Sequence, residues 1–399
     1  MQYSFAEPRK KHVHLFTYSI VVYIILLPFD CFRVGSIGSL LRIYAFVPLI
    51  LLFLSGEFTK LKYSSMLRAM VLYMLWAFIT CYFSIDIDVS FSSFISLSTN
   101  MILVILLGSM HSYNEKEIQI LLKAFIVSGW VMLFCFLFFG NSDNYAGRLV
   151  LEFEDGSSQD ANYANGYMLC AFVFHIYKAI KEKRVIHFIA AAVMSSVVIM
   201  TGSRGALVAF VCCILFVIAF VIRNSNHKIR ILLISIGVAV LLYYGFLNLL
   251  DQLNPVLASR FSEEYIREHG STGRSEIWEN LLGTFSKANI FRQMAGWGYG
   301  TTRLVNTTTG ITTEGMVAHN LYIDNLISMG FIGALLQICM QIECMKVLFK
   351  SRNAMLVCAY GAFIIMCMSL SLVNYKPMWS VMMMALILGN SGYCADEME

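Results

Sequence analysis

The sequence predicts an all-α, polytopic membrane protein with about twelve transmembrane helices and a long, partly helical loop on its outer face. Two observations predict this class. Of the 399 residues, 58% are hydrophobic and 14% are charged, whereas soluble proteins are about 25% charged. The hydrophobic residues also form repeated runs of roughly 16–22 residues, the length at which a helix crosses a bilayer. A soluble fold cannot bury so much apolar surface, so soluble enzymes, secreted disulfide-linked domains and nucleic-acid-binding proteins are excluded.

The apolar runs follow one another along the chain, so we expect a single integral membrane domain over residues 1–399. Most Lys and Arg of the short loops fall on the same side as Arg9–Lys11, and basic loops stay in the cytoplasm, so both termini are expected inside. No small-residue cleavage site follows Phe29, so the first span is expected to be retained. The approximate predicted spans are 13–29, 38–54, 66–84, 90–110, 117–139, 161–179, 185–201, 204–222, 231–250, 319–341, 354–373 and 377–393.

Two predicted outer segments are longer than a simple connector, residues 140–160 and 251–318. In the second, Ile277, Leu281 and Phe285 recur at the spacing of one helical face. This pattern predicts an amphipathic helix in that loop. Because the cytoplasmic loops are short, we expect the functional chemistry at the outer face.

Histidine placement narrows the candidates for a general base. Of the eight histidines, only His269 and His319 are predicted on the outer side of the membrane. His319 lies where the long loop re-enters the membrane, and a neutral imidazole can remove a hydroxyl proton near neutral pH. The alternative for His319 is a hydrogen-bonding role at the interface.

Outer arginines are candidates for binding a phosphate-rich anion. Arg204 and Arg274 each lie at a predicted helix start, where free N–H groups and the helix dipole favour anions. A guanidinium also forms bidentate hydrogen bonds with phosphate oxygens. Arg42, in the second predicted span, is a third candidate because a charge inside a membrane is costly and usually functional. Snorkelling of Arg42 to the headgroups is the alternative.

Acidic residues offer a competing chemistry. Asp86 and Asp88 form a D-x-D pair in a short outer loop, and such carboxylates can hold Mg²⁺ or Mn²⁺. An interfacial acidic turn is the alternative for this pair. In the other outer loop, Asp160 precedes the sixth predicted span and is expected to cap that helix.

Several of these residues also carry a resemblance to a known family. His319-Asn320, nine residues, Gly330, two residues and Gly333 reproduce the pattern H-(N/S/Q)-x9-G-x-x-G of the bacterial O-antigen ligase and polymerase family. The turn around Arg204 is similar to the Ser-Arg-Gly turn of that family. The Gly-Arg sequence ending at Arg274, with a tryptophan four residues later, resembles its G-R-x-x-x-W helix start.

A further segment is similar to the polymerase members. Arg148, followed by Asp160-Ala161-Asn162, resembles an Arg…Asp-Pro-Asn stretch, with Ala161 in the place of the proline. The resemblance covers residues 145–340, including the long outer loop before His319. The earlier part of the chain matches the family only in being hydrophobic.

The resemblance implies a GT-C-like, inverting, metal-independent glycosyltransferase in the bacterial inner (plasma) membrane, with its active site facing the periplasm. The donor would be a glycan on undecaprenyl diphosphate. The acceptor would be a saccharide, either the lipid A core for a ligase or a lipid-linked repeat unit for a polymerase. No metal, cofactor or nucleic acid is implied.

These expectations assign roles to individual residues. His319 is expected to act as the base, and Arg204, Arg274 and Arg42 to bind the donor diphosphate. The residues expected to bind the acceptor or support the site are Asn320, Arg148, Asp160, Gly330 and Gly333.

Two other functions stay open. A flippase or transporter of lipid-linked oligosaccharides fits the number of spans, but no inverted repeat is visible and the long loop lies on one side only. A metal-dependent lipid-linked glycosyltransferase would use Asp86 and Asp88 instead of His319.

Overall fold

A computed structural model describes residues 12–34, 38–56, 59, 61–142, 147–152, 158–223, 252, 255–259, 262, 273–308 and 317–394. The predicted span 231–250 lies outside these residues. The α-helices are α1 (Leu15–Ile25), α2 (Leu40–Tyr44), α3 (Phe46–Ser55), α4 (Ser65–Cys81), α5 (Ile87–Ser109), α6 (Glu115–Phe139), α7 (Ala161–Ala164), α8 (Leu169–Glu182), α9 (Val185–Met200), α10 (Arg204–Arg223), α12 (Pro255–Ser259), α14 (Arg274–Lys287), α15 (Ile290–Ala295), α16 (Thr302–Thr308), α17 (Leu321–Lys350), α18 (Ala354–Met366) and α19 (Lys376–Ser391). Short 3₁₀ helices are η1 (Leu27–Phe29), η3 (Asn165–Met168) and η4 (Leu372–Asn374).

Four described helices, α5, α6, α10 and α17, are long and apolar enough to cross a membrane. Other apolar helices, such as α4 and α9, are shorter. The described helices begin and end within a few residues of most predicted spans, so the prediction of a mainly helical membrane protein is confirmed. A count of about twelve spans stays a prediction.

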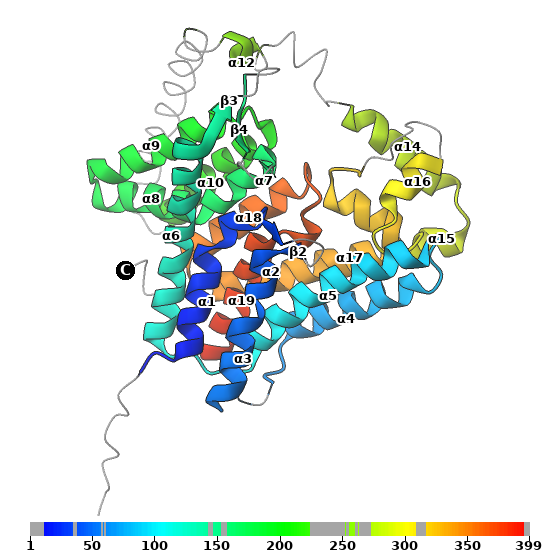
Figure 1. Cartoon of the computed structure of the whole chain (residues 1–399), viewed down its shortest axis with the longest axis horizontal. Helices are drawn as coiled ribbons and strands as arrows, with labels where there is room; N and C mark the ends of the chain where they lie inside the picture. The colour runs from blue at the N-terminus through cyan, green and yellow to red at the C-terminus, as the bar shows by residue number, and fades with distance from the viewer. Residues whose placement is uncertain are drawn as a thin grey trace, which may run out of the picture.

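The helices surround a buried central helix, α19. Every residue of α19 from Lys376 to Leu388 is buried, and α19 packs along α5 and against α17 (Figure 1). The helices α1 and α6 pack side by side. In a separate pair, α4 packs on α17. Several helices begin with a side-chain cap: Asn114 and Glu117 form a reciprocal capping box at the start of α6.

Two of the loops predicted on the outer side contain, in their described residues, small antiparallel sheets that the all-α prediction missed. One pairs β1 (Arg33–Val34) with β2 (Gly38–Ser39), and the other has the order β3 (Gly140–Ser142), β4 (Leu149–Glu152), β5 (Ser158–Gln159). Strands this short carry no detectable alternation of polar and apolar residues, so the sequence could not reveal them. The larger sheet lies above the bundle in Figure 1.

The described parts of 251–318 are largely helical, as predicted. Ile277, Leu281 and Phe285 of α14 are all buried. They form a small apolar cluster with residues that include Val305 of α16 and Ile327 of α17. Figure 1 shows α14, α15 and α16 together at one end of the molecule, beside the ends of α4 and α5.

The predicted continuous span 319–341 is broken at Gly330. This residue has φ +67° and ψ −168°, so α17 consists of two helical pieces on either side of it. A side chain at Gly330 would overlap the backbone of Met294 and Ala295 in α15. Beside the break, the backbone N–H of Gly298 donates to the Ser328 carbonyl at 2.9 Å. The conformation and the close approach of α15 therefore both require glycine.

We expect Gly330→Ala to destabilise the protein by about 1–3 kcal/mol from backbone strain, with the overlap on α15 adding to that cost. Thermal unfolding of the purified protein in detergent measures the effect. Gly283→Ala in α14 is the matched control, because a side chain there meets no atom within 4 Å and alanine favours a helix. Equal melting temperatures for the two variants would contradict the assignment of Gly330.

Candidate active site

Four chain segments bring charged side chains together: the starts of α7, α10 and α14, and residues 318–320 before α17. Arg274 lies close enough to Asp160 and Arg204 for both charges to affect its pKa. The ring of His319 is affected in turn by the charges of Arg274 and Asp160. The structure therefore assembles four of the residues singled out in the sequence, although they are distributed over more than 150 positions of the chain.

The turn at residues 367–371, between α18 and η4, connects these segments. Its backbone carbonyls accept hydrogen bonds from the Leu321 N–H (2.8 Å), from Asn320 Nδ2 (3.1 Å) and from Arg274 Nη1 (2.9 Å). Its Ser371 hydroxyl donates to the carboxylate of Asp324. One short turn thus holds both the His319 segment and the start of α14. In Figure 1, α14 belongs to the helices at the right and α18 to the bundle, so Arg274 reaches from one group to the other.

This turn differs from the prediction, in which residues 354–373 form one span. The helix α18 ends at Met366 instead. A signal was present: Ser369, Ser371, Asn374 and Lys376 form a polar run in an otherwise apolar region. Such a run favours an irregular segment lined by polar contacts over a lipid-facing helix.

His319 is held at the membrane-side end of the long loop. The following residue, Asn320, caps α17: its side-chain oxygen accepts hydrogen bonds from the N–H groups of Tyr322 and Ile323. His319 itself has φ +49°, a conformation that few residues other than glycine adopt. Its ring is half-buried, and among the described residues its buried Nδ1 has no hydrogen-bond partner.

The pKa of His319 lies below the usual value for histidine. Burial is the main cause, and the nearby charge of Arg274 lowers the pKa further, while Asp160 acts in the opposite direction. The lowered pKa favours the neutral form of the imidazole. A neutral ring is the protonation state that a base requires.

Asp324 is a further candidate residue of this site, and it is not among the residues singled out in the sequence. It is almost fully buried, and its Oδ1 accepts a hydrogen bond from the N–H of Ala318 (3.2 Å). Its Oδ2 accepts the hydroxyl of Ser371. Asp324 thus fixes the residue immediately before His319 and ties it to the 367–371 turn. The sequence did contain a signal for Asp324. It is an acidic residue in the first helical turn after His319, where the chain is predicted to re-enter the membrane.

We expect Asp324→Asn to lower the rate of the protein's reaction by at least about tenfold, because small displacements of a catalytic group have large effects on rate. Ligand binding to Arg274 is expected to change little. Ser328→Ala is the matched control: the Ser328 hydroxyl bonds to the backbone carbonyl of Asp324, at 2.6 Å, and leaves its carboxylate untouched. An equal loss of rate in both variants would mean that Asp324 only stabilises α17.

Arg204 and Arg274 place two like charges close together at two helix starts. Burial is the main cause that lowers the pKa of Arg274; Asp160 acts in the opposite direction, and the charge of Arg204 lowers the pKa further. Neither cation is favoured by the helix dipole at its position. A side chain at Gly205 would lie 2.5 Å from Ser369 Oγ, so α10 starts directly against the 367–371 turn. Two guanidinium groups at two helix starts could together hold an anion such as a diphosphate.

Arg148 and Asp160 support the same region from the outer loop. Arg148 Nε donates to the carbonyl of Thr201 at 2.8 Å, and its side chain lies against Gly202, directly before α10. Asp160 caps α7, as predicted, by accepting the N–H of Asn162 at 2.7 Å. The carboxylate stays exposed beside the two arginines.

Other residues singled out in the sequence lie elsewhere. Arg42 in α2 donates to Ser96 Oγ of α5 at 2.9 Å and is not among the charges that affect His319 or Arg274. Gly330 lies at the far end of the first piece of α17, beside α15. Gly333, in the next turn, has Met329 packed where a side chain would begin. These two glycines therefore shape the helix that follows His319 and do not line its ring.

In the D-x-D pair, Asp86 has a structural role as a helix cap. Asp86 Oδ1 accepts the N–H of Val89 at 3.0 Å and caps α5, while Asp88 is exposed in the first turn. Among the described residues, one group of three side chains has the composition and spacing of a metal site, namely His14, His111 and Glu117. That group lies at the starts of α1 and α6, away from the residues around His319.

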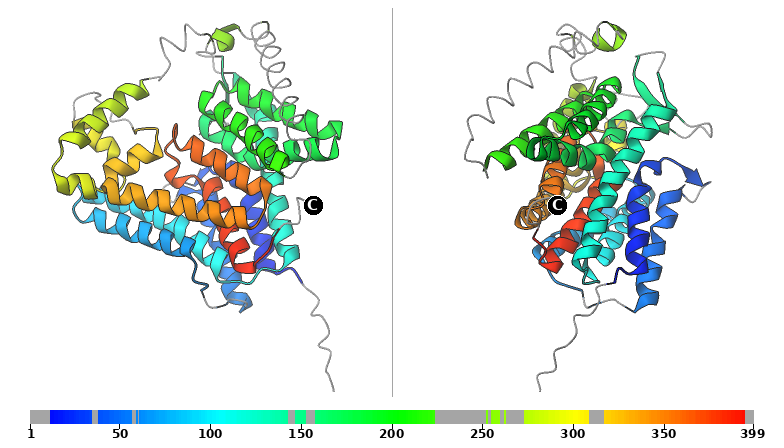
Figure 2. Two further views of the ribbon diagram at one scale, coloured as in Figure 1. Left: turned by 180° about the vertical axis from the view of Figure 1, so that it is seen from behind. Right: turned by 90° about the vertical axis from the view of Figure 1, so that its left-hand side faces the viewer.

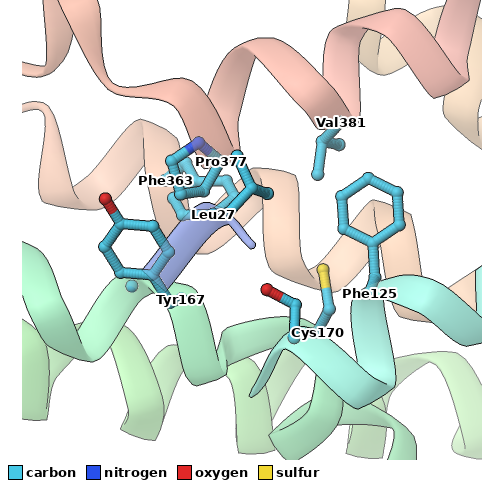
Figure 3. Close-up of a pocket in the computed structure, with 9 residues that line it drawn as sticks. Leu27, Phe125, Tyr167, Cys170, Phe363, Pro377 and Val381 are labelled. Carbon is cyan, nitrogen blue, oxygen red and sulfur yellow. The ribbon is translucent and has the colours of Figure 1, made fainter. Parts of the chain in front are cut away.

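A small cavity lies inside the bundle, between α6, the α7–α8 region, α18 and α19 (Figure 3). Its lining is mostly apolar, with Phe125, Phe363 and Val381 facing it, and the polar atoms come from groups such as Ser128 and Cys170. None of its lining residues is charged, so this cavity is not where a diphosphate would bind.

Comparison with known proteins locates the family relationship in the second half of the chain. Residues 189–338 match the family model described as O-antigen ligase. This region contains Arg204, Arg274, His319, Gly330 and Gly333. A search of curated proteins found no match. The match agrees with the resemblance seen in the sequence motifs: residues 189–338 are similar to the O-antigen ligase family.

Proposed function

We propose that the protein transfers a glycan from undecaprenyl diphosphate to an acceptor sugar at the periplasmic face of the inner membrane, with both termini in the cytoplasm. The observation that carries this proposal is the position of neutral His319 beside Arg274, which itself lies close to Arg204. The reaction needs a base for the acceptor hydroxyl and cations for a leaving diphosphate, and this site contains both.

In the proposed reaction, His319 Nε2 takes the proton from the acceptor hydroxyl as its oxygen forms a bond to the anomeric carbon of the donor sugar. The bond from that carbon to the diphosphate oxygen breaks, and the diphosphate leaves with the electron pair. A single displacement of this kind inverts the anomeric configuration. Nε2 is the nitrogen assigned to this step because Nδ1 is buried.

Arg204 and Arg274 would neutralise the charge that develops on the diphosphate, which is usually a large contribution to catalysis. Asp160 is placed to stabilise the imidazolium that forms on His319, because its charge already raises the pKa of that ring. Asn320 and Asp324 act as positioning residues through the contacts described above. The reaction requires no metal or cofactor.

The acceptor distinguishes a ligase from a polymerase. A ligase would use the lipid A core, and a polymerase a lipid-linked repeat unit. The similarity of Arg148 and Asp160 to a polymerase stretch, together with the contact of Arg148 to the turn before Arg204, favours a polymerase.

The envelope glycans of a deletion strain test this proposal. Single repeat units on the lipid A core would identify a polymerase, and an unmodified core with accumulated lipid-linked polymer would identify a ligase. The wild-type gene should restore the profile and a His319→Asn gene should not. An unchanged glycan profile in the deletion strain would contradict the proposal.

A further inference from the structure

A second set of charged residues lies where α2, α5 and α19 meet. We call it the Arg42 group. Its members come from the residue after η1 and from β2, α2, α5 and α19, and they are Asp30, Ser39, Arg42, Ser96 and Lys376. The Arg42 group shares no residue with the candidate active site.

Within this group, one cation is already neutralised. Lys376 is 9% exposed and forms an ion pair with the carboxylate of Asp30. Ser39 reinforces the pair: its hydroxyl donates to Asp30 Oδ1 at 2.6 Å and accepts the backbone N–H of Arg42 at 3.2 Å. The single carboxylate of the group is therefore engaged by Lys376.

The other cation, Arg42, has only a neutral partner among the described residues. Its half-buried guanidinium makes one hydrogen bond, from Nη2 to Ser96 Oγ. It also lies close enough to Lys376 for the two charges to repel each other. A partly buried charge without a counter-ion is costly, and most of the donors of this guanidinium are still available. The Arg42 group therefore has the charge and the geometry to bind an anion.

The surroundings of Arg42 identify the kind of molecule that carries this anion. The helices α2 and α3 lie at the edge of the molecule, where the blue ribbons form the right-hand border of the second view in Figure 2. Around Arg42 and along α3 they expose large apolar side chains, namely Leu40, Ile43, Phe46, Val47, Ile50, Phe53 and Leu54. A phosphate at Arg42 with a hydrocarbon chain along this face is the arrangement of a membrane-anchored lipid phosphate.

One short segment joins the Arg42 group to the active site. Ser371 binds Asp324 at one end of it, and Lys376 binds Asp30 at the other. Between them, Asn374 accepts a hydrogen bond from Asn100 of α5 at 3.4 Å. Five residue steps span at most about 18 Å. The Arg42 group is therefore connected, through five residue steps of chain, to the turn that holds Asp324 and the segment before His319.

We infer that Arg42, supported by Lys376, binds a phosphate group of the acceptor when that acceptor is itself a lipid-linked saccharide. This inference rests on the proposed function. It reassigns Arg42 from the donor site to a second site for the other substrate. Both lipid-linked substrates would then be held by their phosphates, with their sugars meeting at His319.

Steady-state kinetics of the full-length protein in lipid nanodiscs test this inference. For Arg42→Gln we expect the KM of a lipid diphosphate-linked acceptor to rise about tenfold or more, because charge-assisted hydrogen bonds are lost. The KM of the donor should change less than twofold. A soluble acceptor without a phosphate should react equally well with the wild-type protein and with Arg42→Gln. Arg68→Gln, which removes an exposed arginine of α4, is the matched control and should leave all KM values unchanged.

Other results would overturn the inference. A raised donor KM would return Arg42 to the donor site. An unchanged acceptor KM, combined with altered sensitivity to phosphatidylglycerol in the nanodisc, would mean that Arg42 binds ordinary phospholipid headgroups. Arg42→Lys, which keeps the charge, is the second variant if Arg42→Gln does not fold, and should raise the acceptor KM to a smaller extent.

A direct binding measurement separates this inference from the proposed function. Titration with farnesyl diphosphate should reveal two sites in the wild-type protein. Arg42→Gln should remove one site and Arg274→Gln the other. Two-site binding without any glycan transfer would support the second phosphate site while contradicting the proposed function. A single site, lost in Arg274→Gln and retained in Arg42→Gln, would overturn the inference.

Discussion

His319→Asn is expected to reduce glycan transfer by about 10²–10⁴-fold, the usual contribution of general-base catalysis. Asparagine is the informative substitution because it tolerates the positive φ of this position, +49°. The variant should therefore fold and insert normally and lose only the base. Donor binding, measured by titration with a lipid diphosphate, should remain close to that of the wild type. Transfer at the wild-type rate would contradict the assignment of His319.

The pH dependence of the same reaction gives an independent test. Activity requires neutral His319, so the rate should fall as the pH falls through its pKa. Because burial and Arg274 lower that pKa, the fall should occur below the ordinary histidine value of about 6.5. Asp160→Asn removes the charge that raises the pKa, and should move the fall to still lower pH. A shift to higher pH in this variant would contradict the proposed electrostatics.

Arg274→Lys is expected to lose most of the transfer activity, by about 10²-fold, although it keeps the positive charge. A lysine cannot form two parallel hydrogen bonds to a phosphate, and it cannot at the same time reproduce the bond from Arg274 Nη1 to the Ser369 carbonyl. Arg204→Lys should have a similar effect on the leaving diphosphate. The measurement is kcat/KM for the donor, with melting temperature as the check on folding.

Arg292→Lys is the control for these substitutions. Arg292 also lies in the long outer loop, where its guanidinium bonds to the backbone carbonyls of Phe83 and Gly296. It has no place in the proposed site, so its variant should transfer glycan at a near-normal rate. If Arg274→Lys and Arg204→Lys both kept near-normal activity, these arginines would act only through long-range electrostatics and not through paired hydrogen bonds to the diphosphate.

The sequence predicted most of the helical framework because membrane helices depend on local hydropathy. The helix α6, for example, runs from Glu115 to Phe139 where a span was predicted over 117–139. The break at Gly330 was not predicted, because it depends on the approach of α15 from another part of the chain. Hydropathy is averaged over a window of residues that includes such a break. The two helical pieces are therefore predicted as one span.

The candidate site was predictable in its residues and only partly in its arrangement. His319, Arg204 and Arg274 belong to motifs that the sequence displays. Their convergence depends on contacts between distant residues, such as the hydrogen bond between Arg274 and Ser369, 95 positions apart. The role of Arg42 stays a prediction, because neither hydropathy nor motif spacing gives its distance from Arg274.

Transfer by the purified protein in nanodiscs, with EDTA present, tests the proposed metal-independent reaction. The assay contains a labelled glycan on a polyprenyl diphosphate and a saccharide acceptor. The proposed mechanism predicts that the acceptor gains glycan and that an equal amount of free polyprenyl diphosphate appears, in wild type and not in His319→Asn. The claim would be contradicted by a reaction that needs added Mn²⁺ and is lost in Asp86→Asn, or by movement of the intact donor across the bilayer without cleavage.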